Sequence, residues 1–332
     1  MTTTRIVFIL TLLTFAYWPA ADAVANDAAA PSFRAFRDAP KIQDPEKAPI
    51  LAVARADKRV VAVGDYGIVI LSDDGRRFRQ AKSVPTRSVL TSVFFLDGRQ
   101  GWAAGHDGTV IASSDGGETW RVLREEPGKE RALLSVWFEN ALHGLAVGQF
   151  GLALETEDGG KSWRERRLVD AGDAGEKHLL QIFAAAEGLV FVAAEAGGVF
   201  RSEDSGRNWK LVQTDNKGSF WTGLALRDGS LLLAGMRGHI YRSGDRGLSW
   251  QEVPGIPQQS LTSIIQAADD SVNLVGMSGL VVTSKDQGQT FVTKVRPDRA
   301  NLTAIAIMPA GELLFSLAGV ISGKNESGPG TK

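Results

Sequence analysis

The stretch Ser113-Ser114-Asp115-Gly116-Gly117-Glu118-Thr119-Trp120 decides the fold of this chain, because versions of it recur along the sequence. Its form is S-x-D-x-G-x-x-W, with Thr as an alternative at the first position and Phe at the last. Further copies occupy residues 156–163, 202–209, 243–250 and 284–291, and a copy one residue shorter occupies 72–78. Starting from Asp74, the aspartates follow one another at spacings of 41, 43, 46, 41 and 41 residues. A repeat of about 40–45 residues is the period of a four-stranded propeller blade.

The side chains of this motif predict a structural role. A short carboxylate at a turn accepts hydrogen bonds from backbone N–H groups that no strand satisfies, and the Trp buries a large apolar surface between blades. Because the same residue types recur in every repeat, the alternative of several catalytic or Ca²⁺-binding aspartates is disfavoured. The residues predicted to act structurally are Asp115, Trp120, Asp158, Trp163, Asp204, Trp209, Asp245, Trp250 and Asp286.

A second element precedes each copy: an apolar run, a G-x-x-G turn and another apolar run. Residues 60–63 lie before Gly64-Asp65-Tyr66-Gly67, and residues 231–234 lie before Gly235-Met236-Arg237-Gly238. Two strands joined in this way form a hairpin, and their continuous apolar character indicates burial on both faces. With an inner strand such as 90–93 and an outer strand after the motif, each repeat has four strands.

The repeats add up to an all-β, seven-bladed propeller of four-stranded antiparallel blades, spanning residues 46–323. Six units carry the motif, and a seventh set of strands at 302–307, 312–316 and 320–322 lacks it. The last blade therefore lacks its outer strand. We expect residues 26–45 to supply that strand and so remove an open edge. The polar tail, 324–332, is expected to be disordered.

The N-terminus has the features of a signal peptide over residues 1–25. Arg5 precedes a short apolar run at 6–18, and Ala23-Val24-Ala25 fits a cleavage site. The mature protein is therefore expected to be periplasmic or otherwise exported, and not transmembrane after cleavage. The chain has no Cys, which excludes disulfides, thiol catalysis and Cys-ligated metal. A net charge of −1 gives no electrostatic footprint for nucleic acid.

Strand alternation predicts where a partner would bind. The G-x-x-G turns and the connections between blades must share one face, and the Asp motifs must lie on the other. Residue pairs inside the turns differ from blade to blade, which suits a specific surface. The partner-binding candidates are Tyr66, His106, Asp107, Phe150, Glu195, Met236 and Arg237 in the turns, with Arg87 and Arg131 in the connections. Further positive side chains in the connections are Lys177, His178, Lys217 and Arg299.

Catalytic motifs are not found, and the protein is predicted not to be an enzyme, with no cofactor and no metal. The four histidines, His106, His143, His178 and His239, show no ligand spacing. A sialidase-like glycoside hydrolase remains an alternative, because Tyr66, Asp107, Glu195 and Arg237 fall on one predicted face. Such an enzyme needs an arginine cluster, yet only one turn carries Arg. A receptor module for peptide or glycan is a further alternative.

The eight-residue motifs resemble the Asp-boxes of the bacterial neuraminidase repeat superfamily. Together with the spacing, the truncated last blade, the signal peptide and the G-x-x-G hairpins, they resemble the photosystem II stability/assembly factor family over about residues 45–323. This resemblance implies a seven-bladed propeller, expected to be monomeric, that assists assembly of a membrane protein complex by contacting the complex or its exported loops. Members of that family also occur in non-photosynthetic bacteria, some with export or transport systems.

Overall fold

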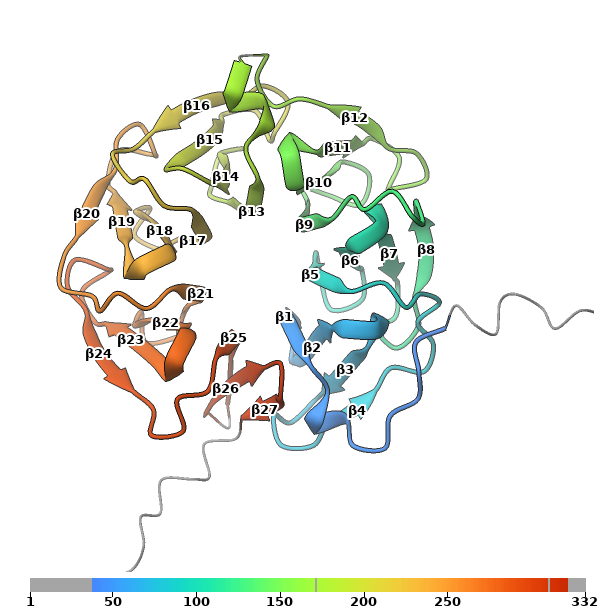
Figure 1. Ribbon diagram of the computed structural model, residues 1–332. Coiled ribbons are helices and arrows are strands. Elements are labelled where there is room, and N and C mark those ends of the chain that lie inside the picture. The colour runs from blue at the N-terminus through green and yellow to red at the C-terminus, as the bar shows by residue number, and fades with distance from the viewer. Residues whose placement is uncertain (1–37, 171, 310, 322–332) are drawn as a thin grey trace, which may run out of the picture. The chain divides into compact units, whose positions relative to one another are not determined.

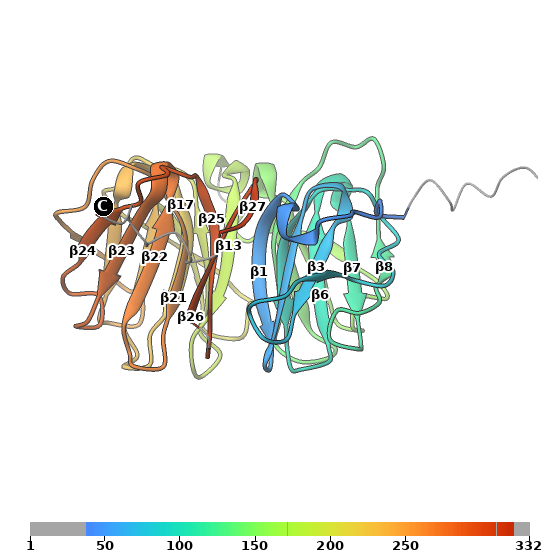
Figure 2. The same ribbon diagram turned by 90° about the horizontal axis from the view of Figure 1, so that it is seen from below.

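A computed structural model describes residues 38–170, 172–309 and 311–321. These residues form seven antiparallel sheets that follow one another around a ring (Figure 1). Seen from the side, the strands run between the two faces of the ring (Figure 2). The seven-bladed architecture predicted from the repeat is confirmed. No helix in the described part of the chain has the length and apolar character needed to cross a membrane.

Each blade is one sheet, and its strands are numbered from the centre of the ring outward. Blades 1 to 3 comprise β1 (Ile50–Ala56), β2 (Arg59–Gly64), β3 (Val69–Ser72), β4 (Arg79–Gln80), β5 (Leu90–Phe95), β6 (Gly101–Gly105), β7 (Val110–Ser113), β8 (Arg121–Arg124), β9 (Leu133–Phe138), β10 (Gly144–Gly148), β11 (Ala153–Thr156) and β12 (Arg164–Arg166). Blades 4 and 5 comprise β13 (Leu179–Ala184), β14 (Val190–Ala194), β15 (Gly198–Ser202), β16 (Lys210–Gln213), β17 (Phe220–Ala225), β18 (Leu231–Gly235), β19 (Ile240–Ser243) and β20 (Gln251–Val253). Blades 6 and 7 comprise β21 (Leu261–Gln266), β22 (Val272–Gly276), β23 (Leu280–Ser284), β24 (Val292–Val295), β25 (Leu302–Met308), β26 (Gly311–Ser316) and β27 (Gly319–Ile321).

Short 3-10 turns connect several of these strands. They are η2 (Pro45–Lys47), η3 (Asp65–Gly67), η4 (His106–Gly108), η5 (Gln149–Gly151), η6 (Gly172–Glu176), η7 (Met236–Gly238) and η8 (Met277–Gly279). The second strands of the blades are mostly buried, and β14 and β18 are buried at every position. Their continuous apolar runs face a neighbouring sheet on each side, as the sequence predicts.

The Asp motif forms a closed hydrogen-bonded turn. Asp115 accepts hydrogen bonds from the N–H of Thr119 at 3.0 Å, from the Thr119 hydroxyl at 2.7 Å and from the Ser113 hydroxyl at 2.8 Å. The Gly117 N–H donates to Ser113 Oγ at 2.9 Å, and Trp120 Nε1 donates to the Gly117 carbonyl at 2.9 Å. The carboxylate and the hydroxyl therefore satisfy N–H groups that no strand partner reaches.

The fourth residue after each aspartate completes this turn, a feature not singled out in the sequence. It carries a side-chain donor in five copies: Thr119, Ser162, Asn208, Ser249 and Thr290. The motif also joins neighbouring blades. Trp120 packs in one cluster with Val61 and Leu71 of the preceding blade, and a Cβ added to Gly117 would lie 3.2 Å from each of these side chains. Glycine is needed there because two blades approach closely, and its φ is +84°.

The hydrogen bonds of the Asp motifs predict how the stability of the fold changes at acidic pH. The hydroxyl and the N–H of Ser162 donate to Asp158 and lower the pKa of its carboxyl from 3.8 to about 2. A carboxyl with a lower pKa in the folded state stabilises the fold above its unfolded pKa, and this contribution is lost as pH falls through the folded pKa. We expect Asp158→Ala to have a melting temperature that falls less steeply than wild type between about pH 4 and 2.

Thermal unfolding followed by circular dichroism across this pH range checks the prediction. Ser162→Ala removes the hydroxyl donor and keeps the backbone donor, so its pH response should lie between those of wild type and Asp158→Ala. Parallel curves for all three proteins would show that these hydrogen bonds do not favour the ionised carboxylate.

The predicted closing strand is not found in the described part of residues 26–45. The sheet of blade 7 has three strands among the described residues, β25, β26 and β27. Residues 38–42 instead lie against blade 1, where the Ala39 N–H donates to the Val84 carbonyl at 2.9 Å and the Ile42 N–H donates to Gln80 Oε1 at 3.1 Å. Within the described residues this part of the prediction is wrong: these partners lie at and just beyond β4, and η2, which does lie beside β27, is a 3-10 turn that adds no strand to blade 7. Residues 26–37 and 322–332 lie outside the described residues.

The ring closes by side-chain packing between blades 7 and 1. Ile50, Val60 and Ile70 of blade 1 share one buried cluster with Ala306 and Phe315 of blade 7. The Thr303 hydroxyl donates to the Ile50 carbonyl at 2.7 Å and links the two innermost strands. Burial of this apolar surface joins the first and last blades without a shared sheet.

Candidate partner-binding face

The G-x-x-G turns adopt a conformation that is costly for most residues. In η3, Tyr66 has φ 54° and ψ 26°, and Gly67 has φ +69°. The Ile68 N–H donates to the Asp65 carbonyl at 3.0 Å, which closes a type I′ turn. Such turns favour Asn, Asp or Gly at the first central position, because φ is positive there.

Six turns place a residue other than glycine at this position. These residues are Tyr66, Asp107, Phe150, Ala196, Arg237 and Ser278, with φ values between 51° and 57°. Only Asp107 belongs to the residue types that the turn favours. The large side chains of Tyr66, Phe150 and Arg237 are therefore held there at a cost of roughly 1 kcal/mol each.

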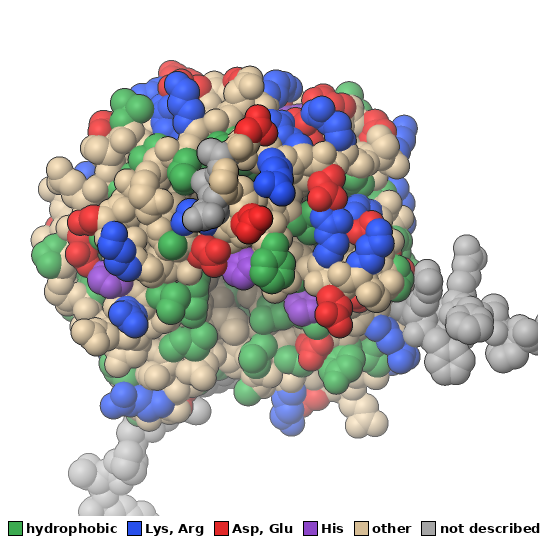
Figure 3. Space-filling model, turned by 45° about the horizontal axis from the view of Figure 1, so that its top comes forward, with side chains coloured by type: hydrophobic (Ala, Val, Ile, Leu, Met, Phe, Trp, Pro, Cys, Tyr) green, Lys and Arg blue, Asp and Glu red, His purple; other side chains and the backbone are tan. Residues whose placement is uncertain are grey.

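The turns and the connections between blades lie on the same face, as strand alternation predicts. The Gly108 N–H donates to the Arg131 carbonyl at 2.6 Å, and the Gly151 N–H donates to the Lys177 carbonyl at 2.9 Å. We call this side the turn face; it consists of η3, η4, η5, residues 195–198, η7, η8 and residues 316–319, with the adjoining connections. Figure 1 views the ring along its axis. In the oblique view of Figure 3, hydrophobic side chains gather around a central hollow, and charged side chains are interspersed.

The structure exposes some of the predicted contact residues and covers others. Tyr66 is 58% exposed and Phe150 is 73% exposed, so both present apolar surface to solvent. Met236, predicted with them as a contact residue at a hairpin tip, is instead half-buried, because it precedes the turn residue that projects outward. Leu317, in the corresponding turn of blade 7, is 58% exposed as well; that turn begins with Ser316 in place of the first glycine.

Two groups of predicted residues are brought together over blades 2 and 3. Arg87, His106 and Asp107 line one hollow of about 390 Å³, and the Ser88 hydroxyl donates to Asp107 at 3.2 Å. Arg131 and Phe150 line a neighbouring hollow of about 360 Å³. Gln149 contributes to both hollows, so they adjoin.

The remaining candidates lie around the rest of the ring. Tyr66 is at the tip of blade 1, Glu195 is half-buried at the tip of blade 4, and Arg237 is exposed at the tip of blade 5. Arg131 is half-buried, and its charge is already matched by Glu165 at 2.7 Å. It is therefore less available to a partner than Arg237.

The sialidase-like alternative would place its Tyr, carboxylates and Arg at the tips of four different blades. The other tyrosine of the described residues, Tyr241, is 2% exposed and donates its hydroxyl hydrogen bond to Asp215 at 2.8 Å. Burial and this hydrogen bond raise the pKa of the Tyr241 phenol. A buried phenol that favours its protonated form is poorly suited to act as a nucleophile.

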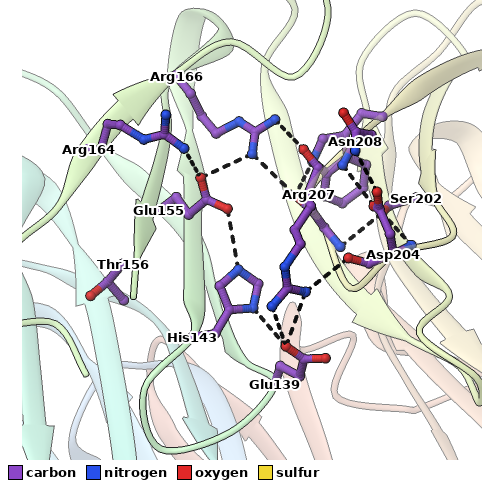
Figure 4. Close-up of polar contacts among 12 residues, drawn as sticks. Glu139, His143, Glu155, Thr156, Arg164, Arg166, Ser202, Asp204, Arg207 and Asn208 are labelled. Atoms are coloured by element: carbon purple, nitrogen blue, oxygen red, sulfur yellow. Dashed lines mark hydrogen bonds and ion pairs between the residues drawn. The ribbon is translucent and has the colours of Figure 1, made fainter. Parts of the chain in front are cut away.

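A buried charge network, not predicted from the sequence, lies on the Asp-motif side of blade 3 (Figure 4). The Glu155 side chain is 3% exposed and accepts from Arg164 Nη2 at 2.6 Å and from Arg166 Nη1 at 3.1 Å. His143, also buried, lies between two carboxylates: its Nε2 is 3.4 Å from Glu155 and its Nδ1 is 3.0 Å from Glu139. Both carboxylates can accept a hydrogen bond from His143 at the same time only when both ring nitrogens carry a proton.

This network reaches into the next blade. Arg166 Nη2 donates to the Arg207 carbonyl at 2.7 Å, and Arg207 pairs with Glu139 at 3.4 Å. Arginines make comparable contacts with motif carbonyls at other junctions: Arg59 to Gly116, Arg201 to Arg246 and Arg242 to Gln287. In the sequence, these contacts could have been suspected from the charged residue directly before several of the motifs. These residues are Glu155, Arg201 and Arg242.

The same cluster offers possible metal ligands, but its charges are already balanced. Ligand atoms of His143, Glu155 and Glu157 lie within 4.8 Å of one another. Arg164 and Arg166 both contact Oε2 of Glu155, and their positive charges would oppose a bound cation. The donor set therefore fits an ion-pair network better than a metal site.

Comparisons with known proteins agree with the repeat and the fold. Residues 113–255 match the model of the family described as photosynthesis system II assembly factor YCF48. No curated protein matches the chain. A solved structure titled "YCF48 bound to D1 peptide" is 20% identical, covers 84% of this chain and 94% of that one, and has a TM-score of 0.66.

Two further solved structures have the same fold. YCF48 from Cyanidioschyzon merolae is 17% identical over 86% of this chain and 96% of that one, with a TM-score of 0.64. A streptogramin B lyase is 12% identical over 84% of this chain and 94% of that one, with a TM-score of 0.69, so the fold alone does not decide function. Residues 113–255 are thus similar to the photosystem II assembly factor family, and the chain shares the propeller fold of the solved YCF48 structures over most of its length.

Proposed function

We propose that this chain is an exported, non-catalytic propeller that assists the assembly or stability of a membrane protein complex. In this proposal, the turn face binds an exported segment of a subunit. The observation that carries it is the presence of Tyr66, Phe150 and Arg237 at positive φ, where Asn, Asp or Gly would be more stable. Exposed side chains whose backbone conformation destabilises the fold indicate a binding surface.

The composition of the turn face suggests the chemistry of the partner. Tyr66, Phe150 and Leu317 offer exposed apolar surface. Lys217 and Arg237 are exposed, and neither forms an ion pair with another described residue. An extended segment that combines acidic and apolar side chains would match both features. The relative titled as bound to a D1 peptide supports a peptide ligand for a propeller of this family.

A pair of charge reversals tests the proposed face. Arg237→Glu combined with Lys217→Glu should abolish co-purification of membrane proteins with the tagged chain. Its circular dichroism and melting temperature should stay close to wild type, because exposed substitutions usually change stability by less than about 0.5 kcal/mol. Arg131 is not used, since its reversal would also break the contact with Glu165.

The matched control reverses two exposed charges at the Asp motifs, Arg121 and Lys161. This control should bind like wild type. Loss of binding in the control, with binding kept by the first pair, would move the site to the other face. The purified protein also reports on export, because its N-terminal residue should be Asn26 if cleavage follows Ala25.

A further inference from the structure

A side chain of blade 4 holds the turn of blade 3. The N–H of Phe150, in η5, donates to His178 Nδ1 at 2.9 Å. The two rings also pack edge to face, with centroids 4.7 Å apart and planes at 72°. His178 is half-buried and directly precedes β13, so it approaches the turn from the neighbouring blade.

The hydrogen bond defines the protonation of the ring. Because Nδ1 accepts the N–H of Phe150, it carries no proton in this arrangement. His178 is then the neutral tautomer with its proton on Nε2. A side chain without an acceptor at this place would leave the Phe150 N–H unpaired and the ring of Phe150 without its neighbour.

In two other turns, the residue at the position equivalent to His178 also accepts a hydrogen bond from the turn, but with a different side chain. The Arg237 N–H donates to Ser260 Oγ at 3.3 Å, and the Ser278 N–H donates to Asn301 Oδ1 at 2.9 Å. Each acceptor directly precedes the first strand of the next blade, as His178 does. In η5 the acceptor also packs its ring edge to face on the side chain of the turn residue.

We infer that His178 is a positioning residue for partner binding, which it serves by fixing Phe150. The inference rests on the proposed binding role of the turn face. Phe150 borders the hollow that Arg131, Glu165 and Arg167 also line, and Arg167 is exposed. An apolar partner side chain packs on Phe150, and an adjacent partner carboxylate meets Arg167. Holding the ring in advance lowers the entropic cost of binding.

Measurements on the protein alone test the positioning step. Nitrogen NMR of His178 should show Nδ1 without a proton. His178→Ala should speed hydrogen exchange at the Phe150 amide, and His178→Asn should restore protection, because an Asn oxygen accepts the equivalent bond at Ser278. Asn301→Ala is the control and should speed exchange at Ser278 while leaving Phe150 unchanged. Unchanged exchange at Phe150 in His178→Ala would overturn the inference.

Binding is measured with a fluorescein-labelled peptide in which glutamates alternate with leucine and phenylalanine. Phe150→Gly should weaken binding without loss of stability, because glycine suits the turn. His178→Ala should weaken it about threefold to tenfold, the effect of freeing one ordered side chain. In the Phe150→Gly background, His178→Ala should add no further loss. His178→Asn should bind with an affinity between those of wild type and His178→Ala.

The outcomes separate the two proposals. If Phe150→Gly binds the peptide like wild type, or wild type does not bind it, the proposed use of this part of the turn face is wrong. If Phe150→Gly weakens binding and His178→Ala does not, the proposed function stands and the positioning role fails. The positioning role also fails if the two losses add in the double variant.

Discussion

Trp120→Ala is expected to destabilise the propeller by about 3–5 kcal/mol, the usual cost of removing a buried Trp from a core. Trp120 is 5% exposed, packs edge to face with Phe95 at 6.1 Å and joins the cluster shared by blades 1 and 2. Its Nε1 donates to the Gly117 carbonyl, so the substitution also leaves that group without its donor. Urea unfolding measures the change, and binding by the folded fraction should be unaffected.

Trp250→Ala is the matched control for this variant. Trp250 occupies the same motif position in blade 5, but it is half-buried and its Nε1 has no hydrogen-bond partner among the described residues. Its replacement should therefore cost less free energy of unfolding than that of Trp120. Equal losses of free energy of unfolding in the two variants would mean that burial and the Nε1 hydrogen bond do not determine how much this Trp stabilises the fold.

Glu155→Ala is expected to lower the free energy of unfolding by about 3 kcal/mol, the lower end of the range for breaking a buried ion pair. Arg166 and His143 would lose the carboxylate that faces them, and His143 is buried. Arg164 is largely exposed and can be solvated, which limits the loss. Since Arg166 also holds the Arg207 carbonyl, the contact between blades 3 and 4 should weaken.

Glu203→Ala provides the comparison for this variant. Glu203 pairs with Arg201 at 2.7 Å within an equivalent motif, and its side chain is 60% exposed, whereas that of Arg201 is 4% exposed. Arg201 keeps its contact with the Arg246 carbonyl in this variant and water can replace the exposed carboxylate, so the loss of stability should be smaller than for Glu155→Ala. Urea unfolding of both variants decides the point. If Glu155→Ala were no less stable than Glu203→Ala, burial of the network would not matter to stability.

The sequence by itself determined the blades and their number. The motif that contains Asp115 closes its hydrogen bonds within eight residues, so its chemistry can be read from one short segment. The apolar runs around the G-x-x-G turns reflect burial of β2, β6 and their counterparts, a property each segment carries locally. The repeat also assigned the turns to one face, because antiparallel strands must alternate in direction.

Only the tertiary structure decided what happens between blades. The ring closes through a buried cluster that includes Ile50 of blade 1 and Phe315 of blade 7, although the sequence suggested a strand from the N-terminus. Glu155 has its role because Arg166 reaches the Arg207 carbonyl of the next blade, and His178 because Phe150 lies beside it. These contacts join residues that are 28 or more positions apart, so their partners depend on how neighbouring sheets are packed. Local propensity and period do not contain that information, and the contact residues of the turn face depend on it.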